Sequence, residues 1–572
     1  MKHFLISFLF SISILFAHAN RIILTSVSQI NSGKWLAGDT IVLKNNTYTD
    51  QSILIKGDGT AANPIVLSAE TAGKVFLTGT SHIGISGQYV EVSGLFFKNG
   101  NLSGSEIVAF RTSSTVFADH CRLTNCAIVD CNPADSAVDS KWVSLYGANN
   151  KVDRCSFQNK TNSGTLMVVW LQTGITPNHI INQNYFGYRN ANVDSTGSEL
   201  NGQEIIRVGD SSTSMQTAGV SVTNNIFEHC NGEIEIISNK SCGNYYSNNL
   251  FLECKGMLTL RHGNSCTVDG NYFIGNGVAN TGGVRIIGEN HKVYNNYFEN
   301  LTGTNYRSAL CIVRGKENSA LNEYFQVKNA LVAFNTMVNC AQAFIINYNS
   351  STTCTLPPIG TTIAHNHIFN TSASSVNVTI AQTNPLMDVV WKNNVMNQGK
   401  YVDFPYTSAQ VITGKNAKMV QGSTIPPIFE PTSGSALSTY STNNFPEISV
   451  DLRGRSRVLP PKIPGASQIN GTTTRITPLR NSVGASFFDN GVTSIKTVPY
   501  SSKMQASVAH QFLTVATSKS GVITLYSVAG IPIFSEFIQE GIFTKYIESK
   551  GIYFLSYKES GGSFMLKKIL VW

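Results

Sequence analysis

The chain carries a short recurring pattern of apolar and polar positions. Each clear copy has an apolar or aromatic first residue, three residues that include one or two Asn, and an apolar or aromatic pair ending in Phe, as in Val222-Thr-Asn-Asn-Ile-Phe227. Such copies occupy residues 222–227, 246–251, 268–273 and 293–298, and looser ones occupy 92–96, 152–157, 181–186, 332–337, 363–369 and 391–396. Successive clear copies begin about 22 to 25 residues apart, a period typical of solenoids. Repeats therefore cover most of the chain.

Each repeat is too short for a pair of helices and is rich in β-branched and aromatic residues, with Asn and Gly where the chain must turn. The pattern predicts an all-β fold, a right-handed parallel β-helix whose coils stack so that the apolar positions fill the interior. The recurring Asn suits a left-handed turn or a side-chain ladder between coils. The composition agrees, because 42% of the 572 residues are hydrophobic, only 13% are charged, and 47 are glycine.

The chain changes character at both ends. Residues 1–19 have a basic start, a short apolar core and a small-x-small ending, which predicts a secretory signal peptide too short to span a membrane. We expect the β-helix to occupy residues 20–470. A Ser/Thr/Asn-rich stretch at 471–505 is typical of a linker. Residues 506–572 alternate like a small β-sandwich.

The chain holds eleven cysteines, of which Cys230, Cys242, Cys254 and Cys266 recur about every twelve residues inside the repeats. An exported chain could form disulfides, but this spacing favours stacked, buried thiols. The odd number leaves at least one cysteine free or paired outside the chain. No C-x-x-C pair is present, so a structural zinc site has no support.

The net charge of +8, with a pI near 8.8, favours a polyanionic partner such as a uronic-acid polysaccharide. No long Lys/Arg run or nucleic-acid-binding motif accompanies the charge, so nucleic acid is not expected as a partner. Mild basicity that serves only solubility is the alternative. No G-x-S-x-G elbow or phosphate-binding loop is present, so serine hydrolase and nucleotide-dependent functions lack support.

Two carboxylates, Glu233 and Glu235, alternate in a strand-like run, so they should point the same way. Like charges side by side repel unless a cation lies between them, and Ca²⁺ accepts irregular oxygen sites readily. Solvated carboxylates on an exposed strand are the alternative. Lys240 follows in the same run, and Arg261 comes one repeat later. Together these residues could remove the C5 proton of a uronate and stabilise the departing O4 oxygen.

Residues from about 25 to 470 resemble polysaccharide lyase family 6, which contains alginate lyases and chondroitinase B. The matching motifs are Asn201-Gly-Gln-Glu-Ile-Ile-Arg-Val-Gly209, Asn231-Gly-Glu-Ile-Glu235 with Lys240, Arg261-His262, and Asn322-Glu323. The resemblance implies that Asn201, Glu233 and Glu235 hold Ca²⁺. It also implies that Lys240 is the base and Arg261 the acid. Gln203 and Glu204 lie close to Asn201, and either could supply the oxygen instead.

Further residues are candidates for supporting roles. His262 is expected to position the substrate or Arg261, and Glu323 to orient Arg261 or Lys240 by an ion pair. Arg285 is the preferred candidate among arginines on successive coils that could clamp uronate carboxylates. The others are Arg207, Arg307 and Arg314. A contact between coils, or a plain surface arginine, is the alternative for each.

These observations predict a secreted, Ca²⁺-assisted polysaccharide lyase, with alginate as the first choice because the family favours it. A dermatan sulfate lyase and a non-catalytic surface β-helix are the alternatives. A pectin hydrolase would need paired acidic residues on separate coils, which are not evident. A pectate lyase would share the calcium and arginine, but the Lys240/Arg261 pairing favours family 6. Residues 506–572 resemble type IX secretion sorting domains, which implies secretion or cell-surface attachment by that machinery. A small carbohydrate-binding module is the alternative there.

Overall fold

The computed structural model describes residues 20–104, 106–193, 197, 199–371, 379–384, 388–398, 402–422, 426–458, 461–488, 504–509, 512–517, 519–527, 531–547, 549, 551–559 and 564–571. The chain divides into two compact units, Met1–Phe488 and Asp489–Trp572. The predicted signal peptide lies outside the described residues. Within them, no helix has the length and apolarity that a membrane crossing requires.

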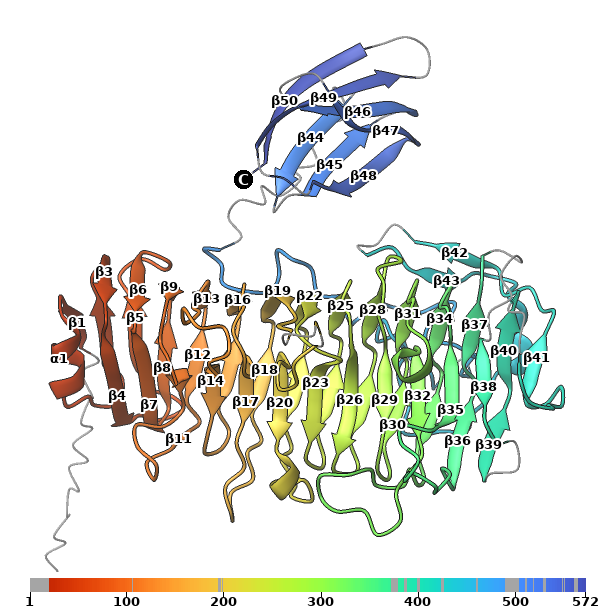
Figure 1. The fold of residues 1–572 in the computed structure, drawn as a ribbon, viewed down its shortest axis with the longest axis horizontal. Helices are drawn as coiled ribbons and strands as arrows, with labels where there is room; N and C mark the ends of the chain where they lie inside the picture. Colours follow the sequence, from red (N-terminus) through yellow and green to blue (C-terminus); the bar gives the residue numbers. More distant parts are fainter. Residues whose placement is uncertain are drawn as a thin grey trace, which may run out of the picture. The chain divides into compact units, whose positions relative to one another are not determined.

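The first unit is a parallel β-helix built from three long sheets (Figure 1). Sheet A contains β1 (Arg21–Leu24), β2 (Thr40–Leu43), β5 (Ile65–Ala69), β8 (Val90–Ser93), β12 (Arg122–Thr124), β15 (Lys151–Asp153), β18 (Ile180–Asn182), β21 (Ser221–Thr223), β24 (Tyr245–Ser247), β27 (Thr267–Asp269), β30 (Lys292–Tyr294), β33 (Leu331–Ala333), β36 (Thr361–Ala364) and β39 (Val389–Lys392). Each strand pairs in parallel with the strand one coil away, which confirms the predicted stacking.

Sheets B and C complete each coil. Sheet B contains β4 (Ser52–Asp58), β7 (His82–Gln88), β10 (Glu106–Ala109), β11 (Ala118–Asp119), β14 (Lys141–Leu145), β17 (Met167–Val169), β20 (Ile206–Gly209), β23 (Glu235–Lys240), β26 (Met257–His262), β29 (Val284–Ile286), β32 (Leu310–Val313), β35 (Phe344–Tyr348) and β38 (Ile380–Gln382). Sheet C contains β3 (Asn46–Thr49), β6 (Val75–Gly79), β9 (Leu95–Gly100), β13 (Ala127–Val129), β16 (Ser156–Gln158), β19 (Tyr185–Asn190), β22 (Ile226–Asn231), β25 (Leu250–Leu252), β28 (Tyr272–Ile274), β31 (Tyr297–Glu299), β34 (Thr336–Val338), β37 (His367–Phe369), β40 (Asn394–Asn397) and β41 (Val411–Thr413).

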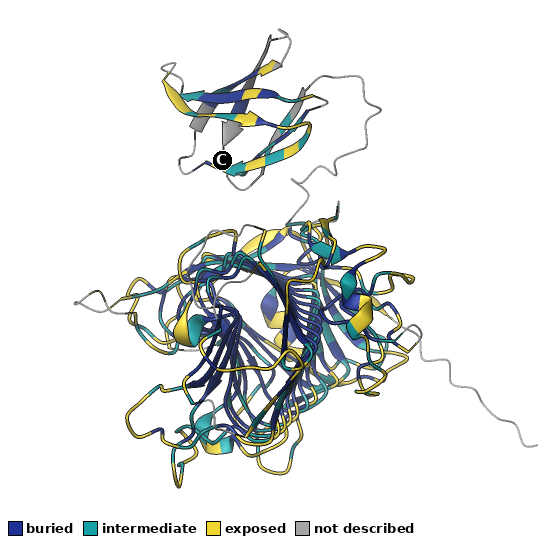
Figure 2. Ribbon diagram, turned by 90° about the vertical axis from the view of Figure 1, so that its right-hand side faces the viewer, coloured by how far each residue is buried: buried dark blue, intermediate teal, exposed yellow. Residues whose placement is uncertain are grey.

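The interior of the β-helix is filled by apolar side chains that include a stack of Phe rings, and Figure 2 shows its strands as mostly buried. The Phe that ends each repeat lies over the Phe of the next coil, with ring centroids 4.7 Å apart for Phe227 and Phe251 and 4.5 Å for Phe251 and Phe273. These rings are buried in the main hydrophobic cluster. The apolar positions of the repeat therefore form the core, as the sequence predicts.

The two residues of each Asn-Asn pair in the repeat have different structural roles. The first Asn takes the left-handed conformation at the turn, with φ of 56° at Asn224 and 52° at Asn248. The second lies buried in a ladder, in which Asn225 Nδ2 donates to Asn249 Oδ1 at 3.0 Å, and Asn249 Nδ2 donates to Asn271 Oδ1 at 2.9 Å. Both structural roles expected for these Asn residues are present.

Replacing Asn249 by alanine is expected to destabilise the β-helix. Its side-chain oxygen accepts from the backbone N–H and the side chain of Asn225, and both donors would lose their partner. Each buried group left unpaired costs about 1–3 kcal/mol. Guanidinium denaturation followed by circular dichroism measures the loss. Asn393→Gly is the matched control, because glycine suits the positive φ of 50° there. An equal loss in both variants would contradict the ladder's role.

Helix α1 (Val27–Ser32) packs at the N-terminal end of the coils, where it covers apolar residues that no preceding coil shields (Figure 1). After β41 the chain forms the antiparallel pair β42 (Met419–Gln421) and β43 (Phe429–Pro431). Three short 3₁₀ helices complete the unit. They are η1 (Ser211–Thr213), η2 (Asn305–Arg307) and η3 (Ala436–Tyr440).

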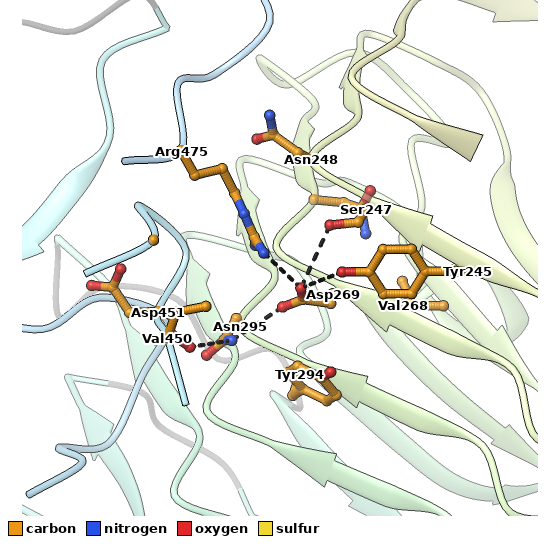
Figure 3. Close-up of polar contacts among 12 residues, drawn as sticks. Tyr245, Ser247, Asn248, Val268, Asp269, Tyr294, Asn295, Val450, Asp451 and Arg475 are labelled. Carbon is orange, nitrogen blue, oxygen red and sulfur yellow. Dashed lines mark hydrogen bonds and ion pairs between the residues drawn. The ribbon is translucent and has the colours of Figure 1, made fainter. Parts of the chain in front are cut away.

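Residues 426–458 and 461–488 form a return segment, which runs back along the coils of the β-helix. Ala466 N donates to Thr336 Oγ1 on β34, and Ala485 N donates to Ser156 Oγ on β16. Figure 3 shows the middle of this path, where the Arg475 guanidinium bonds the buried Asp269 carboxylate at 2.8 Å. Asn295 there joins Asp269 to the Val450 carbonyl. The return segment is thus tied to the coils by buried polar contacts.

The return segment changes one predicted boundary. Residues 471–488, expected to begin a linker, pack against the β-helix and belong to its unit. Val483 and Ala485 are buried, and the Phe487 ring lies 5.8 Å from that of Phe96. Polar composition suggested a linker, but main-chain bonds to turn side chains order the segment, as in Ser486 N to Asn125 Oδ1 at 2.7 Å.

The second unit contains two antiparallel sheets. The sheets comprise β44 (Met504–Ala509), β45 (Phe512–Thr517) and β48 (Gly541–Tyr546), and β47 (Pro532–Ile538), β46 (Gly521–Ser527), β49 (Gly551–Glu559) and β50 (Phe564–Val571). Alternate residues of both sheets, such as Leu513, Val515, Ile523 and Leu525, share one hydrophobic cluster. This arrangement agrees with the predicted small β-sandwich.

The cysteines are all free, and all are buried except Cys242, which is partly exposed. Cys230 and Cys254 lie on consecutive coils, where the Cys230 N–H lies 3.4 Å from Cys254 Sγ. Burial raises the pKa of the Cys266 thiol to about 12. The cysteines thus act as small apolar core residues, as the spacing predicts.

Candidate active site

Three buried carboxylates meet on the outer face of sheet B. Glu204 lies just before β20, Glu235 begins β23, the next strand of the sheet, and Glu233 lies two residues before it. One carboxylate oxygen from each falls within 4.8 Å of the others. Their exposed fractions are only 2%, 5% and 7% respectively. The alternation that predicted a shared direction for Glu233 and Glu235 is therefore realised in a cluster with Glu204.

Each carboxylate of the cluster keeps a fixed partner. Glu204 accepts from Thr165 Oγ1 at 2.6 Å, and Glu233 accepts from the Gly202 N–H at 3.1 Å. Glu235 bonds both Ser238 Oγ and the Arg285 guanidinium. The second oxygen of Glu233, Oε1, is buried without a partner among the described residues. Glu233 Oε1 is thus held in place within the cluster, and a cation or a proton would satisfy it.

Burial, together with the neighbouring negative charges of Glu204 and Glu235, raises the pKa of Glu233 to about 8. A divalent cation among the three carboxylates would remove this repulsion. Hard carboxylate oxygens in an irregular arrangement suit Ca²⁺ better than Mg²⁺, which demands near-octahedral geometry. The residues present therefore fit a calcium ion.

Glu204, and not Asn201, supplies the third buried carboxylate of the cluster. Asn201 is exposed, and its side-chain oxygen accepts from the Gly202 N–H at 2.9 Å. Gln203, the other neighbour considered, donates its amide to the Asn192 and Leu200 carbonyls. Of the three neighbours, only Glu204 directs a buried carboxylate into the cluster.

Lys240 ends β23 and stands beside the cluster. Its side chain is about one-fifth exposed, and its Nζ lies 3.8 Å from Glu204 Oε1. Asn239, the residue before it, is buried within the coil, so the strand directs Lys240 outward. The amine is therefore anchored near the carboxylates and still open to a ligand.

Arg261 comes from β26, the strand next to β23. The pairing passes from Asn239–Leu260 to Lys240–His262, so Arg261 is the extra residue of a β-bulge. Its guanidinium donates to the Glu323 carbonyl at 2.8 Å and lies over the Tyr324 ring at 4.3 Å. The bulge and the loop around Glu323 together hold the Arg261 guanidinium beside Lys240.

His262 is buried at 2% exposure, and its Nδ1 has no partner among the described residues. Burial and the nearby charges of Arg261 and Lys240 lower the pKa of His262 to about 3. The imidazole is consequently neutral at ordinary pH. This environment suits a positioning group rather than a proton carrier.

Two supporting residues have partners that differ from the prediction. Glu323 was expected to pair with Arg261 or Lys240, but its carboxylate pairs with Lys316, and only its backbone carbonyl holds Arg261. Arg285 was expected to clamp substrate, but its side chain is buried and bonds Glu235. Sequence spacing placed both residues near the site, yet it could not reveal which neighbour each would meet.

The remaining candidate arginines differ in their surroundings. Arg307 lies 3.6 Å from the Glu199 carboxylate. Arg314 donates to the Asn347 carbonyl at 3.2 Å and to Thr383 Oγ1 at 3.3 Å. Arg207 lies on β20, the coil before Lys240, and stacks over the Trp170 ring at 5.1 Å. Arg307 and Arg314 are therefore both held by acceptors within the protein.

Several residues that support the site were not identified from sequence. Thr165 and Tyr324 belong to loops on other coils, and no local spacing connects them to the carboxylates. Arg189 is fully buried and donates to the Glu204 carbonyl at 3.0 Å, which fixes the backbone beneath the cluster. Ser238 was detectable in principle, because it follows Glu235 in the same strand.

The fold and the site together define a β-helix protein with a lysine and an arginine on adjacent strands beside a buried carboxylate cluster. The chain belongs to the chondroitinase B family, whose model matches residues 24–421. Its solved relatives include polysaccharide lyases of family 6. No curated protein sequence matches the chain.

The chain is similar to the family 6 alginate lyase AlyGC, with 30% identity and a TM-score of 0.70 over 86% of this chain and 60% of that one. It thus spans about 60% of AlyGC. A mannuronic acid-specific family 6 lyase from human gut microbiota is 30% identical, with a TM-score of 0.58 over 66% of this chain and 86% of that one. The family 6 lyase Pedsa3628 from Pseudopedobacter saltans is 27% identical, with a TM-score of 0.57 over 68% and 98%.

Proposed function

We propose that this protein is an exported polysaccharide lyase that cleaves a 1,4-linked uronic-acid polymer by β-elimination. The observation that carries the proposal is the placement of Lys240 and Arg261 on adjacent strands, beside the buried carboxylates of Glu204, Glu233 and Glu235. A base, a cation and an anion-neutralising site are what this elimination requires.

Lys240 acts as the base in this proposal. Its amine takes the C5 proton of a uronate, and the electrons of that C–H bond form the C4=C5 double bond as the C4–O bond breaks. Glu204 at 3.8 Å holds the Lys240 side chain in place, while the partial exposure of the amine leaves room for the sugar. Positioning of this kind contributes to catalysis by fixing the reacting atoms in advance.

Arg261 stabilises the leaving glycosidic oxygen. An arginine holds its proton too firmly to be a good literal acid, so the guanidinium lowers the cost of the developing negative charge while water supplies the proton. The Glu323 carbonyl and the Tyr324 ring keep the guanidinium oriented before substrate binds. His262, which is neutral, lies buried close to both Arg261 and Lys240.

Glu204, Glu233 and Glu235 would hold Ca²⁺. When bound, the ion would neutralise the C6 carboxylate of the uronate and so make the C5 proton more acidic. The buried, unpartnered Glu233 Oε1 supports this assignment, because a buried carboxylate oxygen without a partner is costly.

Alginate is the substrate we favour. Two of the solved relatives are described as an alginate lyase and a mannuronic acid-specific lyase. Dermatan sulfate is the second candidate, because the matching family model is that of chondroitinase B. The net charge of +8 supports either polyanion. We further propose export through the signal peptide at residues 1–19 and the sandwich at 506–572.

The direct test is ultraviolet absorbance of the conjugated C4=C5 double bond, with purified protein incubated in parallel with alginate, dermatan sulfate and pectate. We expect the absorbance to rise with alginate. A rise with dermatan sulfate alone would correct the substrate and keep the reaction. No rise with any polymer, in the presence of calcium, would overturn the lyase proposal in favour of a non-catalytic surface β-helix.

A further inference from the structure

Arg207 differs from its neighbours in having a charge that the protein does not satisfy. It lies half-buried on β20, and its Nε is buried without a partner. Among the residues that the structure describes, no carboxylate or carbonyl accepts from its guanidinium. The flanking Ile206 and Val208 point into the core, so Arg207 points outward from sheet B.

A stack of planar groups holds Arg207 in place. Its guanidinium lies 5.1 Å from the Trp170 ring, which in turn stacks on Tyr146 with centroids 6.2 Å apart and planes 13° apart. Trp170 Nε1 donates to Ser144 Oγ at 3.2 Å, and the Tyr146 hydroxyl donates to Glu106 at 2.8 Å. The stack therefore fixes the direction of the guanidinium, and a preorganised arginine binds an anion at a lower entropic cost.

The register of sheet B places Arg207 next to the proposed active site. Gly209 pairs with Lys240, so Arg207 is one strand away from Lys240 and two residues back along that strand. Adjacent strands are about 4.8 Å apart, which is comparable to the length of one sugar unit. Gly209 has no side chain to separate Arg207 and Trp170 from Lys240. The two-residue offset adds about 6.6 Å along the strand, so the two backbone positions are about 8 Å apart. A polymer lying obliquely across the strands would thus bring the sugar next to the one at Lys240 within reach of the long Arg207 side chain.

The chemistry of the elimination sets the direction of that polymer. Lys240 removes the C5 proton of the sugar that becomes unsaturated, and Arg261 meets the oxygen that joins this sugar to its neighbour on the non-reducing side. Arg261 lies on β26, one coil after Lys240. The non-reducing end therefore points toward later coils, and the reducing end points toward β20 and β17.

We propose that Arg207 binds the carboxylate of the first uronate on the reducing-end side of the sugar that Lys240 attacks. Trp170 is a positioning residue that holds Arg207 through the stack. This inference rests on the proposed lyase function and adds a binding contact to it. The other arginines weighed for the role are less suited, because Arg285, Arg307 and Arg314 each meet an acceptor within the protein.

The test compares wild type with Arg207→Met on a series of oligouronates labelled at the reducing end. We expect kcat/KM to fall about tenfold or more for oligomers long enough to occupy the Arg207 position. Most of the change should lie in KM, and the shortest cleavable oligomer should be unaffected. Arg207→Lys should restore part of the loss, and Trp170→Leu should reproduce it in weaker form. The matched control is Arg154→Met, a surface arginine beside Asp153 on another side of the β-helix.

A binding measurement keeps the inference independent of turnover. In the Lys240→Ala background, adding Arg207→Met should weaken binding of a long oligouronate about tenfold, as followed by calorimetry. Equal kcat/KM for wild type and Arg207→Met at every length, together with equal binding, would overturn the inference while leaving the lyase intact. If the wild type forms no unsaturated product from any polymer, the lyase and this inference both fail.

Discussion

Replacing Lys240 by alanine is expected to lower the elimination rate on the order of 10²–10⁴-fold, the range for loss of a positioned general base. The remaining site would still bind the uronate, because the carboxylate cluster and Arg261 are held by partners other than Lys240. The loss should therefore appear in kcat, with a smaller change in KM. Initial rates of double-bond formation over a range of substrate concentrations measure both constants.

Circular dichroism should show unchanged β-sheet content in Lys240→Ala, since the side chain lies on the surface of the coil. Lys292→Ala is the control, because that lysine is exposed on β30 of another sheet. Substantial turnover by a folded Lys240→Ala variant would remove the lysine from its role as base.

Removing calcium is expected to abolish turnover, with a loss of at least 10²-fold, and added Ca²⁺ should restore it. The reason is that three buried carboxylates repel one another and the uronate carboxylate unless a cation neutralises them. Glu233→Gln should cause a similar loss that added Ca²⁺ does not fully repair. Rates measured in chelator and in a calcium series check both outcomes.

Glu233→Gln also has an expected effect on stability that does not depend on turnover. With the metal removed, the variant loses one buried negative charge from the cluster, so its melting temperature in chelator should equal or exceed that of the wild type. Calcium should then raise the melting temperature of the wild type more than that of the variant. Glu70→Gln, at a carboxylate paired with Lys44 far along the chain, should change neither property. Full activity in chelator would reject the calcium site.

The fold was accessible from sequence because its determinants are local and repeated. Each Asn-Asn pair marks a turn of its own coil, and each terminal Phe marks a core position. Stacking of the coils then repeats the same Asn–Asn hydrogen bonds and Phe–Phe contacts. Glu233, Glu235 and Lys240 could be identified for the same reason, since they share one short run of chain. Their common placement follows from the geometry of that run.

Contacts between coils were harder to predict, because they depend on the register of the sheet and on loop lengths. Glu204 reaches the cluster through the pairing of β20 with β23, and Arg285 reaches Glu235 from two coils away. The sequence placed Arg285 close to the site but could not show that Glu235 satisfies its charge. Glu323 illustrates the same limit, since its backbone rather than its carboxylate meets Arg261.

The return segment gives this solenoid a property that stacking alone does not provide. In a simple solenoid each coil touches only its neighbours, so coils at one end can unfold while the rest persist. Here the return segment contacts coils from β34 back to β9, so the loss of any coil beneath it also weakens its contacts with the other coils. Because the return segment follows the last coil in the chain, it can pack against the coils only after they have formed. Packing of the return segment is therefore a late folding step, and it makes the stacked coils fold and unfold as one cooperative unit.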